Sequence, residues 1–143
     1  MDDLIFKIAG TDQEIAACFP VMAELRPHLK RDEFIETIHN MERDGYKLTF
    51  LSDGIRILAV AGYRVMRMLC CEPFLYVDDL VTTASERSRG HGTRFLSWLI
   101  EQARKEGCTQ LHLDSGVQRE DAHRFYKKNG MAVSGLHFRL DVK

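Results

Sequence analysis

Apolar residues recur along this chain in two patterns, which predict strands and helices. Short, mostly apolar runs are typical of strands and occur at residues 4–9, 46–51, 55–69, 74–82 and 111–114. Apolar stripes with a period of about 3.6 are typical of amphipathic helices and occur at residues 11–25, 32–44, 93–105 and 120–129. Two last strands, 131–134 and 136–142, are expected to form a hairpin. The order β-α-α-β-β-β-α-β-α-β-β predicts an α/β domain with a mixed sheet.

Local signals refine these elements. Thr11 and Glu14 have the spacing of a capping box, which starts the first helix, and Pro20 is expected to kink that helix. Asp32 is expected to cap the second helix. The sequence Ser52-Asp53-Gly54 predicts a tight hairpin between the strands on either side.

Bulk properties limit the function classes. A chain of 143 residues without a linker or repeat predicts one domain, 1–143. The net charge of −1 leaves no basic excess for a nucleic-acid partner, and the absence of an apolar run of about 18 residues argues against a membrane span. The acidic N-terminus is unlike a signal peptide, so a cytoplasmic location is expected. Four cysteines without C-x-x-C spacing are expected to be reduced thiols, and the scattered histidines predict no metal site.

The stretch 76–108 carries the candidate chemistry. It reads as a strand, a loop that contains Gly90 and Gly92, and an amphipathic helix that stops at Gly107. The first turn of a helix has amide groups without intrahelical acceptors and lies at the positive end of the helix dipole. Glycines let the backbone approach a ligand, and Arg87 and Arg89 add positive charge. The loop therefore predicts a phosphate site, most naturally for a pyrophosphate.

The spacing of the glycines selects among phosphate-binding loops. A P-loop requires G-x-x-x-x-G-K-[ST] and the dinucleotide fingerprint requires a third glycine, and neither is present. The run from Val77 to Gly92 instead resembles, without a gap, the acetyl-CoA motif IEDLVVxPxxRGxGIG of the GNAT superfamily of N-acetyltransferases, with Ser88 where the motif has its first glycine. The resemblance implies a GNAT-type, largely antiparallel sheet flanked by helices. It also implies acetyl-CoA as donor, bound by Leu80, Val81, Thr82, Arg87, Ser88, Arg89, Gly90, His91, Gly92 and Thr93.

A second segment supports the same family. Residues 122–131 resemble the GNAT pattern A-x-x-F-Y-x-x-x-G-F, with Met131 in place of the last aromatic residue. The sequence DAHRFY, followed by HFRL, resembles the corresponding sequences of small bacterial members, including aminoalkylphosphonate acetyltransferases. The resemblance implies that Tyr126 is the general acid, because a phenol can give a proton to the departing thiolate of coenzyme A. The alternative from the residues alone is a core aromatic residue paired with Phe125.

An attacking amine must also lose a proton. Asp78 and Asp79 lie on the strand before the glycine loop, and neighbouring strand residues face opposite sides, so only one should face a given cleft. The resemblance implies that Asp78 is the base, commonly through water. Either aspartate could instead be a structural residue of the sheet.

The expected function is transfer of an acetyl group from acetyl-CoA to a primary amine within a ternary complex. The acceptor is expected to be a small-molecule amine or a lysine or N-terminal amine of a protein, and a homodimer is compatible with this activity. A non-catalytic, acyl-CoA-binding regulatory module is the alternative. A binder of nucleotide phosphates is more remote. The region around Arg26 and Lys30 contains both basic and acidic residues, so its charge does not identify the acceptor. Its arginines and lysine would nevertheless suit an amine that carries an acidic or phosphonate group.

Overall fold

The computed structural model describes residues 3–143, which form two compact units. The first extends to His112 and the second runs from Leu113 to Lys143. In the first unit the elements are β1 (Ile5–Ile8), α1 (Asp12–Leu25), α2 (Arg31–Glu42), β2 (Lys47–Ser52), β3 (Ile57–Met68), β4 (Cys71–Thr82), the short 3₁₀ helix η1 (Ala84–Glu86) and α3 (His91–Lys105). Strand β5 (Gln110–Leu113) ends at the boundary, and α4 (Glu120–Lys128) belongs to the second unit.

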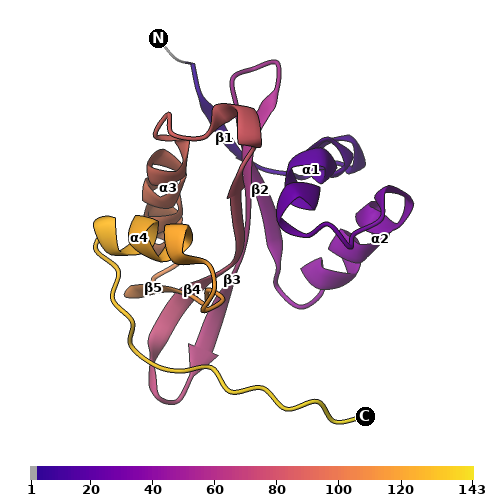
Figure 1. Ribbon diagram of the computed structural model, residues 1–143. Coiled ribbons are helices and arrows are strands. Elements are labelled where there is room, and N and C mark those ends of the chain that lie inside the picture. Colours follow the sequence, from indigo (N-terminus) through magenta and orange to yellow (C-terminus); the bar gives the residue numbers. More distant parts are fainter. Residues whose placement is uncertain (1–2) are drawn as a thin grey trace. The chain divides into compact units, whose positions relative to one another are not determined.

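A five-stranded sheet, in the order β1-β2-β3-β4-β5, forms the centre of the first unit (Figure 1). The pairs β1/β2, β2/β3 and β3/β4 are antiparallel. Strands β3 and β4 are the longest, with 12 residues each, and they pair as a hairpin. The expected α/β class with a largely antiparallel sheet is confirmed.

Helices cover both faces of this sheet: α1 and α2 lie on one face and α3 on the other (Figure 1). Between α1 and α2 the rings of Phe19 and Phe34 meet edge to face, with 5.2 Å between their centroids. On the α3 side, the helix stripe that the sequence predicts is buried, as Phe95, Leu96, Leu99 and Ala103. Burial of these two layers against the sheet is the main favourable term for this unit.

A β-bulge in β4 changes the direction of its side chains. Gly62 pairs with Asp79 and Tyr63 pairs with Val77, so Asp78 is an extra residue that has no paired residue on β3. A bulge breaks the strict alternation of faces. The expectation that Asp78 and Asp79 face opposite sides of the sheet therefore does not hold at this point in the strand.

Helix boundaries differ from the sequence expectation at the start of α2. The capping box of Thr11 and Glu14 is formed as expected, and α1 includes Pro20. Pro20 is exposed, so the carbonyl that loses its backbone partner lies on the side of the helix that water can reach. Lys30, and not Asp32, is the N-cap of α2, and Asp32 lies in its first turn.

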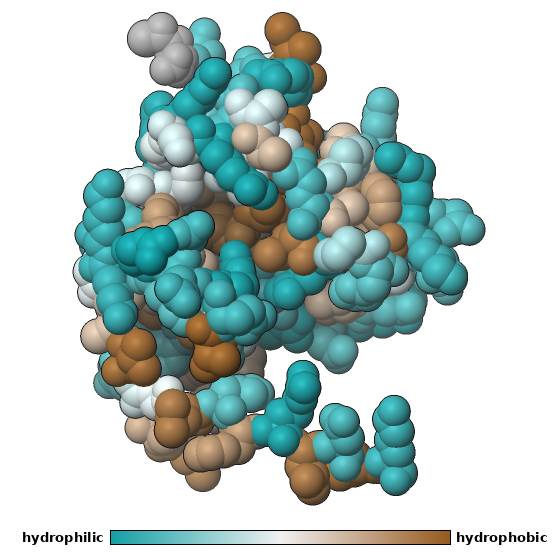
Figure 2. Space-filling view, in the orientation of Figure 1, coloured by the Kyte–Doolittle hydropathy of each residue, from teal (hydrophilic) through white to brown (hydrophobic). Residues whose placement is uncertain are grey.

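The second unit contains α4 and an extended C-terminal segment, residues 131–143. The hairpin expected at 131–134 and 136–142 is wrong, because the structure assigns no strand after Lys128. The apolar side chains that alternate along this segment, Leu136, Phe138, Leu140 and Val142, are each at least 80% exposed. Figure 2 shows hydrophobic side chains on the surface of this extended segment. Alternation alone does not make a strand, because a strand also needs a partner for its backbone groups.

Within residues 3–143, no helix combines the length and the apolar composition needed to cross a bilayer.

Candidate active site

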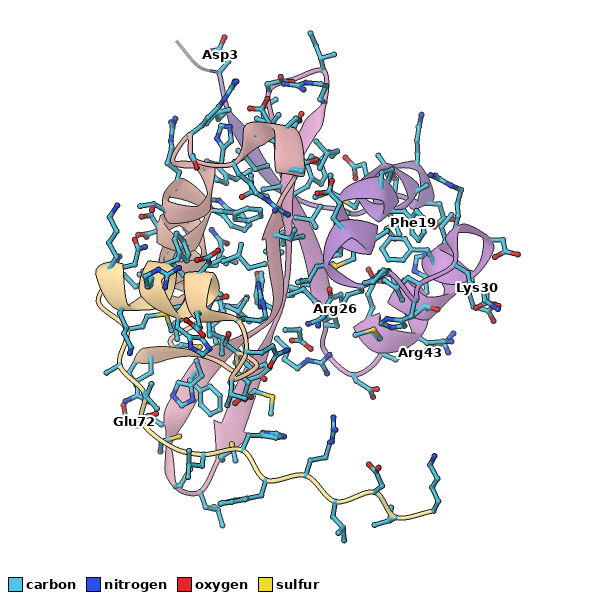
Figure 3. The ribbon with its side chains drawn as sticks, in the orientation of Figure 1. Asp3, Phe19, Arg26, Lys30, Arg43 and Glu72 are labelled. Atoms are coloured by element: carbon cyan, nitrogen blue, oxygen red, sulfur yellow. The ribbon has the colours of Figure 1, made fainter. Side chains whose placement is uncertain are left out.

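Two neighbouring carboxylates at the bulge of β4 are each bound by an arginine. Asp78 accepts two bonds from Arg64 of β3, Nε to Oδ1 at 3.1 Å and Nη2 to Oδ2 at 2.9 Å. Asp79 accepts a bond from Nε of Arg26, at the end of α1, at 2.9 Å. The same arginine donates to the backbone carbonyl of Asp78 at 3.0 Å, and Figure 3 shows it between α1 and the sheet. Arg26 thus joins the end of α1 to both residues of the bulge.

Tyr46, which precedes β2, completes this cluster. Its hydroxyl donates to Oδ2 of Asp79 at 2.8 Å, and the guanidinium of Arg64 lies 5.4 Å from the centre of its ring. Gly62 of β3 makes room for the phenol, because a Cβ there would lie 1.8 Å from the Tyr46 hydroxyl oxygen. A side chain at position 62 would therefore displace Tyr46 from Asp79.

Burial changes the acidity of this cluster. Burial raises the pKa of the Asp78 carboxyl above its ordinary value, while the Arg64 guanidinium acts in the opposite direction. Burial also raises the pKa of Tyr46 well above that of a free phenol, and the Asp79 carboxylate adds to this rise. Asp78 is therefore a stronger base than an aspartate in water, and Tyr46 remains protonated as a donor to Asp79.

The glycine loop, residues 83–92, connects β4 to α3. Gly90 is the N-cap of α3 with φ of 83°, and Ser88 has φ of 67°. Both values lie in the left-handed region that glycine adopts most readily, which explains why the GNAT motif has glycine at the position of Ser88. The first helical bond runs from the amide of Arg94 to the carbonyl of Gly90. The amides of residues 91–93 precede it and have no acceptor within the helix.

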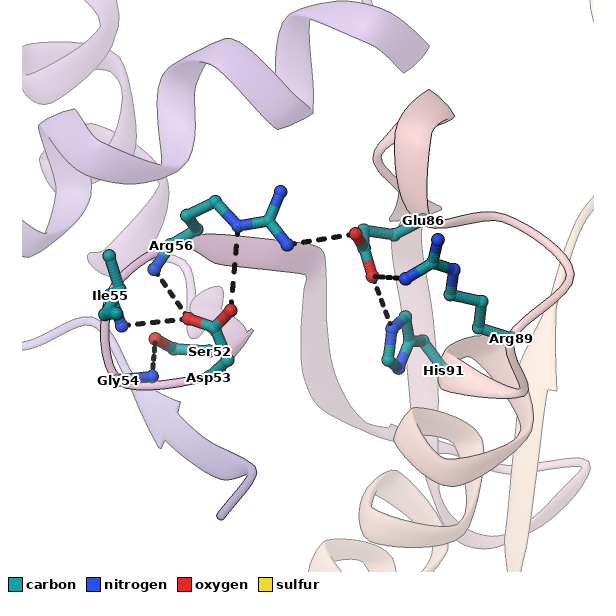
Figure 4. Close-up of polar contacts among 8 residues, drawn as sticks. All are labelled: Ser52, Asp53, Gly54, Ile55, Arg56, Glu86, Arg89 and His91. Carbon is teal, nitrogen blue, oxygen red and sulfur yellow. Dashed lines mark hydrogen bonds and ion pairs between the residues drawn. The ribbon is translucent and has the colours of Figure 1, made fainter. Parts of the chain in front are cut away.

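Two carboxylates hold the glycine loop. Glu24 of α1 accepts from the hydroxyl of Thr83 at 2.6 Å and from the amide of Ala84 at 2.9 Å. Arg87 donates to the carbonyl of Thr82 at 3.2 Å and lies 3.7 Å from Glu24. Glu86 contacts residues at the other end of the loop (Figure 4).

The predicted donor-site residues of β4 differ in what they can offer. Val81 is 8% exposed and belongs to the hydrophobic core beneath α1 and α2, so only its backbone could contact a ligand. Leu80 and Thr82 are half-buried and alternate with it. Arg87 and Arg89 have exposed side chains, 59% and 64%. The loop combines unpaired helix amides, two exposed guanidiniums and open space around Gly90, where a Cβ would meet no atom within 4 Å. These features fit the pyrophosphate of a coenzyme A molecule.

Tyr126 lies in the second unit, on α4. Its ring packs edge to face against Phe125 with 5.5 Å between centroids, and both rings are half-buried. Local contacts of this unit shape the turn before α4: Nε2 of His123 donates to the carbonyl of Gly116 at 2.8 Å. The expected shared face of α4 is confirmed, since Ala122, Phe125, Tyr126 and Asn129 are its less exposed residues together with His123.

Sequence reasoning missed several residues of this site. Arg26, Tyr46 and Arg64 carry no local signal that ties them to the aspartates, because they are 14 to 53 residues away along the chain. Glu24 and Glu86 likewise look like ordinary surface acids in the sequence. By contrast, Asp78, Asp79 and the glycines of the loop belong to a continuous motif that the sequence shows.

Comparisons with known proteins identify the family of this chain. The model of the acetyltransferase (GNAT) family matches residues 9–131. An uncharacterized N-acetyltransferase of Bacillus subtilis, YhdJ, is 35% identical over 132 residues, which cover 91% of this chain and 93% of the relative. The aminoalkylphosphonate N-acetyltransferase of Salmonella typhimurium is 29% identical over 108 residues, 68% of this chain and 69% of that protein.

Solved structures share the fold. The aminoglycoside N-acetyltransferase AAC(6')-Iy in complex with CoA superposes with a TM-score of 0.86 at 10% identity, over 100% of this chain and 97% of that one. A transcriptional regulator from Bacillus halodurans C-125 gives a TM-score of 0.83 at 18% identity, over 97% and 99%. The family match and the relative from Bacillus subtilis show that the chain belongs to the acetyltransferase (GNAT) family and is an acetyltransferase.

Proposed function

We propose that this enzyme transfers the acetyl group of acetyl-CoA to a primary amine by direct attack in a ternary complex. The observation that carries the proposal is the glycine loop: left-handed Ser88 and Gly90, the first turn of α3 and exposed Arg87 and Arg89 occur together at the end of β4. This combination suits the pyrophosphate of the donor. The bound thioester supplies an acyl carbon that an amine can attack.

Two residues of the chain handle the protons. Asp78 accepts the proton that the amine must lose, directly or through water, and its raised pKa suits it to this step. Tyr126 gives a proton to the sulfur as the carbon–sulfur bond breaks. The carbon–nitrogen bond that forms replaces the carbon–sulfur bond, and the products are an amide and free coenzyme A. Arg64 and Arg26 hold the bulge in place.

For the acceptor we propose a small amine that carries an acidic group. Two observations favour it. The aminoalkylphosphonate N-acetyltransferase is among the relatives, and the loop between α1 and α2 exposes His28 and Lys30 near the end of α1. A lysine or N-terminal amine of a protein is the other acceptor class.

The release of free thiol from acetyl-CoA tests the proposal. We expect steady turnover with 2-aminoethylphosphonate, and a higher KM with ethanolamine or with ethylamine, which lack the phosphonate. Turnover with peptides only would contradict the acceptor class. Binding of coenzyme A by calorimetry without thiol release from any amine would contradict the transfer reaction and leave the binding-module alternative.

We also propose that the chain forms a homodimer through its C-terminal segment. Leu136, Phe138, Leu140 and Val142 alternate with polar residues and are exposed, so residues 136–142 have one apolar face when extended. An exposed extended segment with unpaired backbone groups is a template for pairing with another strand. The same segment of a second copy is a complementary partner, because two identical strands can pair antiparallel about a two-fold axis.

A further inference from the structure

Glu86 is the only buried acidic residue within residues 3–143, at 6% exposure, and it lies at the entrance of the glycine loop. Its carboxylate is surrounded by three basic side chains (Figure 4). Oε2 accepts from Nη2 of Arg56 at 2.9 Å. Oε1 accepts from Nε2 of His91 at 3.1 Å and lies 3.5 Å from Nη1 of Arg89.

These contacts keep the carboxylate charged. An ionised carboxyl that leaves water is unfavourable unless hydrogen bonds and opposite charges replace its hydration. The hydrogen bond from His91, followed by that from Arg56, lowers the pKa of Glu86 below the ordinary value of a glutamate. Glu86 is therefore an anion at neutral pH, in a part of the molecule where the proposed ligand is also an anion.

Arg56 connects Glu86 to the turn between β2 and β3, which side-chain hydrogen bonds close. Oδ1 of Asp53 accepts from the amides of Ile55 at 2.9 Å and Arg56 at 2.8 Å. Oδ2 of Asp53 lies 3.6 Å from Nε of Arg56, on the opposite side of the guanidinium from Glu86 (Figure 4). The turn between β2 and β3 thus fixes Arg56, and Arg56 in turn fixes one oxygen of Glu86.

The other oxygen, Oε1, contacts the end of the glycine loop next to α3. His91 is the first residue of α3, and Arg89 precedes Gly90. Between Glu86 and His91 the backbone enters the left-handed region twice, at Ser88 and Gly90. Glu86 thus accepts a hydrogen bond from His91 and forms an ion pair with Arg89, so its contacts lie on both sides of Gly90 and define how this segment enters the helix.

We propose that Glu86 is a positioning residue for the donor: it links the β2–β3 turn to the glycine loop and holds the amides of residues 87–93 in the arrangement that binds pyrophosphate. This inference rests on the proposed function, since it assumes that the loop binds acetyl-CoA. It adds a requirement that the GNAT-like motif does not contain. The affinity of the loop for acetyl-CoA then depends on the buried carboxylate of Glu86. It also depends on the β2–β3 turn, which lies more than 30 residues before the glycines of the loop.

The sign of the effect separates positioning from plain electrostatics. If Glu86 acted only as a nearby negative charge, Glu86→Gln would reduce repulsion and tighten the binding of coenzyme A. If Glu86 positions the loop, the same change releases His91 and Arg89 and weakens binding. We expect the Kd of coenzyme A to rise roughly tenfold, as for the loss of a hydrogen bond to a charged group.

Acetyl-pantetheine, a donor without pyrophosphate, separates loop positioning from general damage to the fold. General damage would lower activity with both donors, whereas a loss of loop positioning should affect only acetyl-CoA. With acetyl-pantetheine the kcat/KM of Glu86→Gln should equal that of the native enzyme, while with acetyl-CoA its KM should rise and its kcat should change little. Glu101→Gln is the matched control, because Glu101 is exposed on α3 and contacts Arg104 at 3.3 Å. This control should bind coenzyme A like the native enzyme.

A second variant tests the link from its other end. Arg56→Gln should raise the Kd of coenzyme A in the same direction, and the double variant with Glu86→Gln should bind no more weakly than Glu86→Gln alone, because both break one connection. If Glu86→Gln does not fold, the Kd of coenzyme A for Arg56→Gln alone tests the inference. An unchanged or lower Kd in either folded variant would overturn the inference, whereas a native enzyme that does not bind coenzyme A would overturn the proposed function itself.

Discussion

At the scale of single residues, the two neighbouring aspartates of β4 have different hydrogen-bond partners. Asp78 is bound by Arg64 through both carboxylate oxygens, and Asp79 is bound by Tyr46 and Arg26. Burial raises the pKa of the Asp78 carboxyl above its ordinary value. Because a proton acceptor is more useful when its pKa approaches the working pH, this rise favours Asp78 as the base.

Asp78→Asn should shift the pH dependence of kcat/KM to higher pH. In the native enzyme the rate should rise as Asp78 loses its proton, above the pH at which an ordinary aspartate does so, because its pKa is raised. Without the carboxylate, only amine that is already neutral in solution can react, so the rising limb should move toward the pKa of the acceptor. Asp79→Asn is the comparison, and the base would be reassigned if that variant showed the shift and Asp78→Asn did not.

Tyr126→Phe should lower kcat and leave binding of acetyl-CoA nearly unchanged. The substitution removes only the hydroxyl and keeps the ring that packs on Phe125. If the phenol protonates the departing thiolate, steady-state kinetics should show a fall in kcat of roughly 10²- to 10⁴-fold with a smaller change in KM. A loss of two- or threefold only, in a variant with native thermal stability, would mean that water or the substrate supplies the proton.

At the scale of elements, the glycine loop shows why a family motif tolerates a departure. Ser88 occupies the position of the motif's first glycine and still adopts a positive φ of 67°. A residue with a Cβ in this region costs about 1–2 kcal/mol. Glu24 and Glu86 bind the loop on either side of Ser88, and such contacts can hold a residue in a conformation that it would otherwise avoid.

Two substitutions in the loop should therefore have opposite effects. Gly90→Val places a β-branched residue at φ of 83°, where open space prevents a clash but the backbone is strained. We expect it to lower the free energy of unfolding by about 1–2 kcal/mol and to weaken binding of coenzyme A. Ser88→Gly removes the strain at its own position and should bind coenzyme A at least as well as the native chain.

Calorimetry for binding and urea denaturation for stability measure both effects. Native affinity in a folded Gly90→Val variant would remove the loop from the donor site.

At the scale of the whole molecule, the described chain divides into a unit organised by the sheet and a smaller unit around α4. The first contains two buried layers on a five-stranded sheet. The second has a C-terminal segment without secondary structure, in which residues 132–143 are all exposed. Exposed apolar residues on an extended segment indicate a surface that another strand can cover.

Phe138→Lys should prevent self-association, whereas His137→Lys should not. The two positions are adjacent, so in an extended segment they face opposite sides, and the introduced residue is the same. We expect light scattering to give the mass of a dimer for the native chain and for His137→Lys, and the mass of a monomer for Phe138→Lys. A native chain that remains monomeric at high micromolar concentration would contradict the proposed dimer.

The sequence alone determined the order and type of most elements, because strand and helix patterns, caps and glycine stops depend on neighbours a few residues away. The capping box at Thr11, the buried stripe of α3 and the loop around Gly90 were all predictable on this basis. The family resemblance in residues 77–92 was equally local, since it is carried by one continuous motif.

Only the tertiary structure decided which groups meet. Arg26 reaches Asp79 across 53 positions and Arg56 reaches Glu86 across 30, and no local pattern encodes such pairs. The bulge at Asp78 depends on the register of β4 against β3, which removes the alternation that the sequence predicts. The C-terminal segment has the apolar alternation of a strand but no strand assignment, because a strand forms only where another backbone supplies its hydrogen bonds.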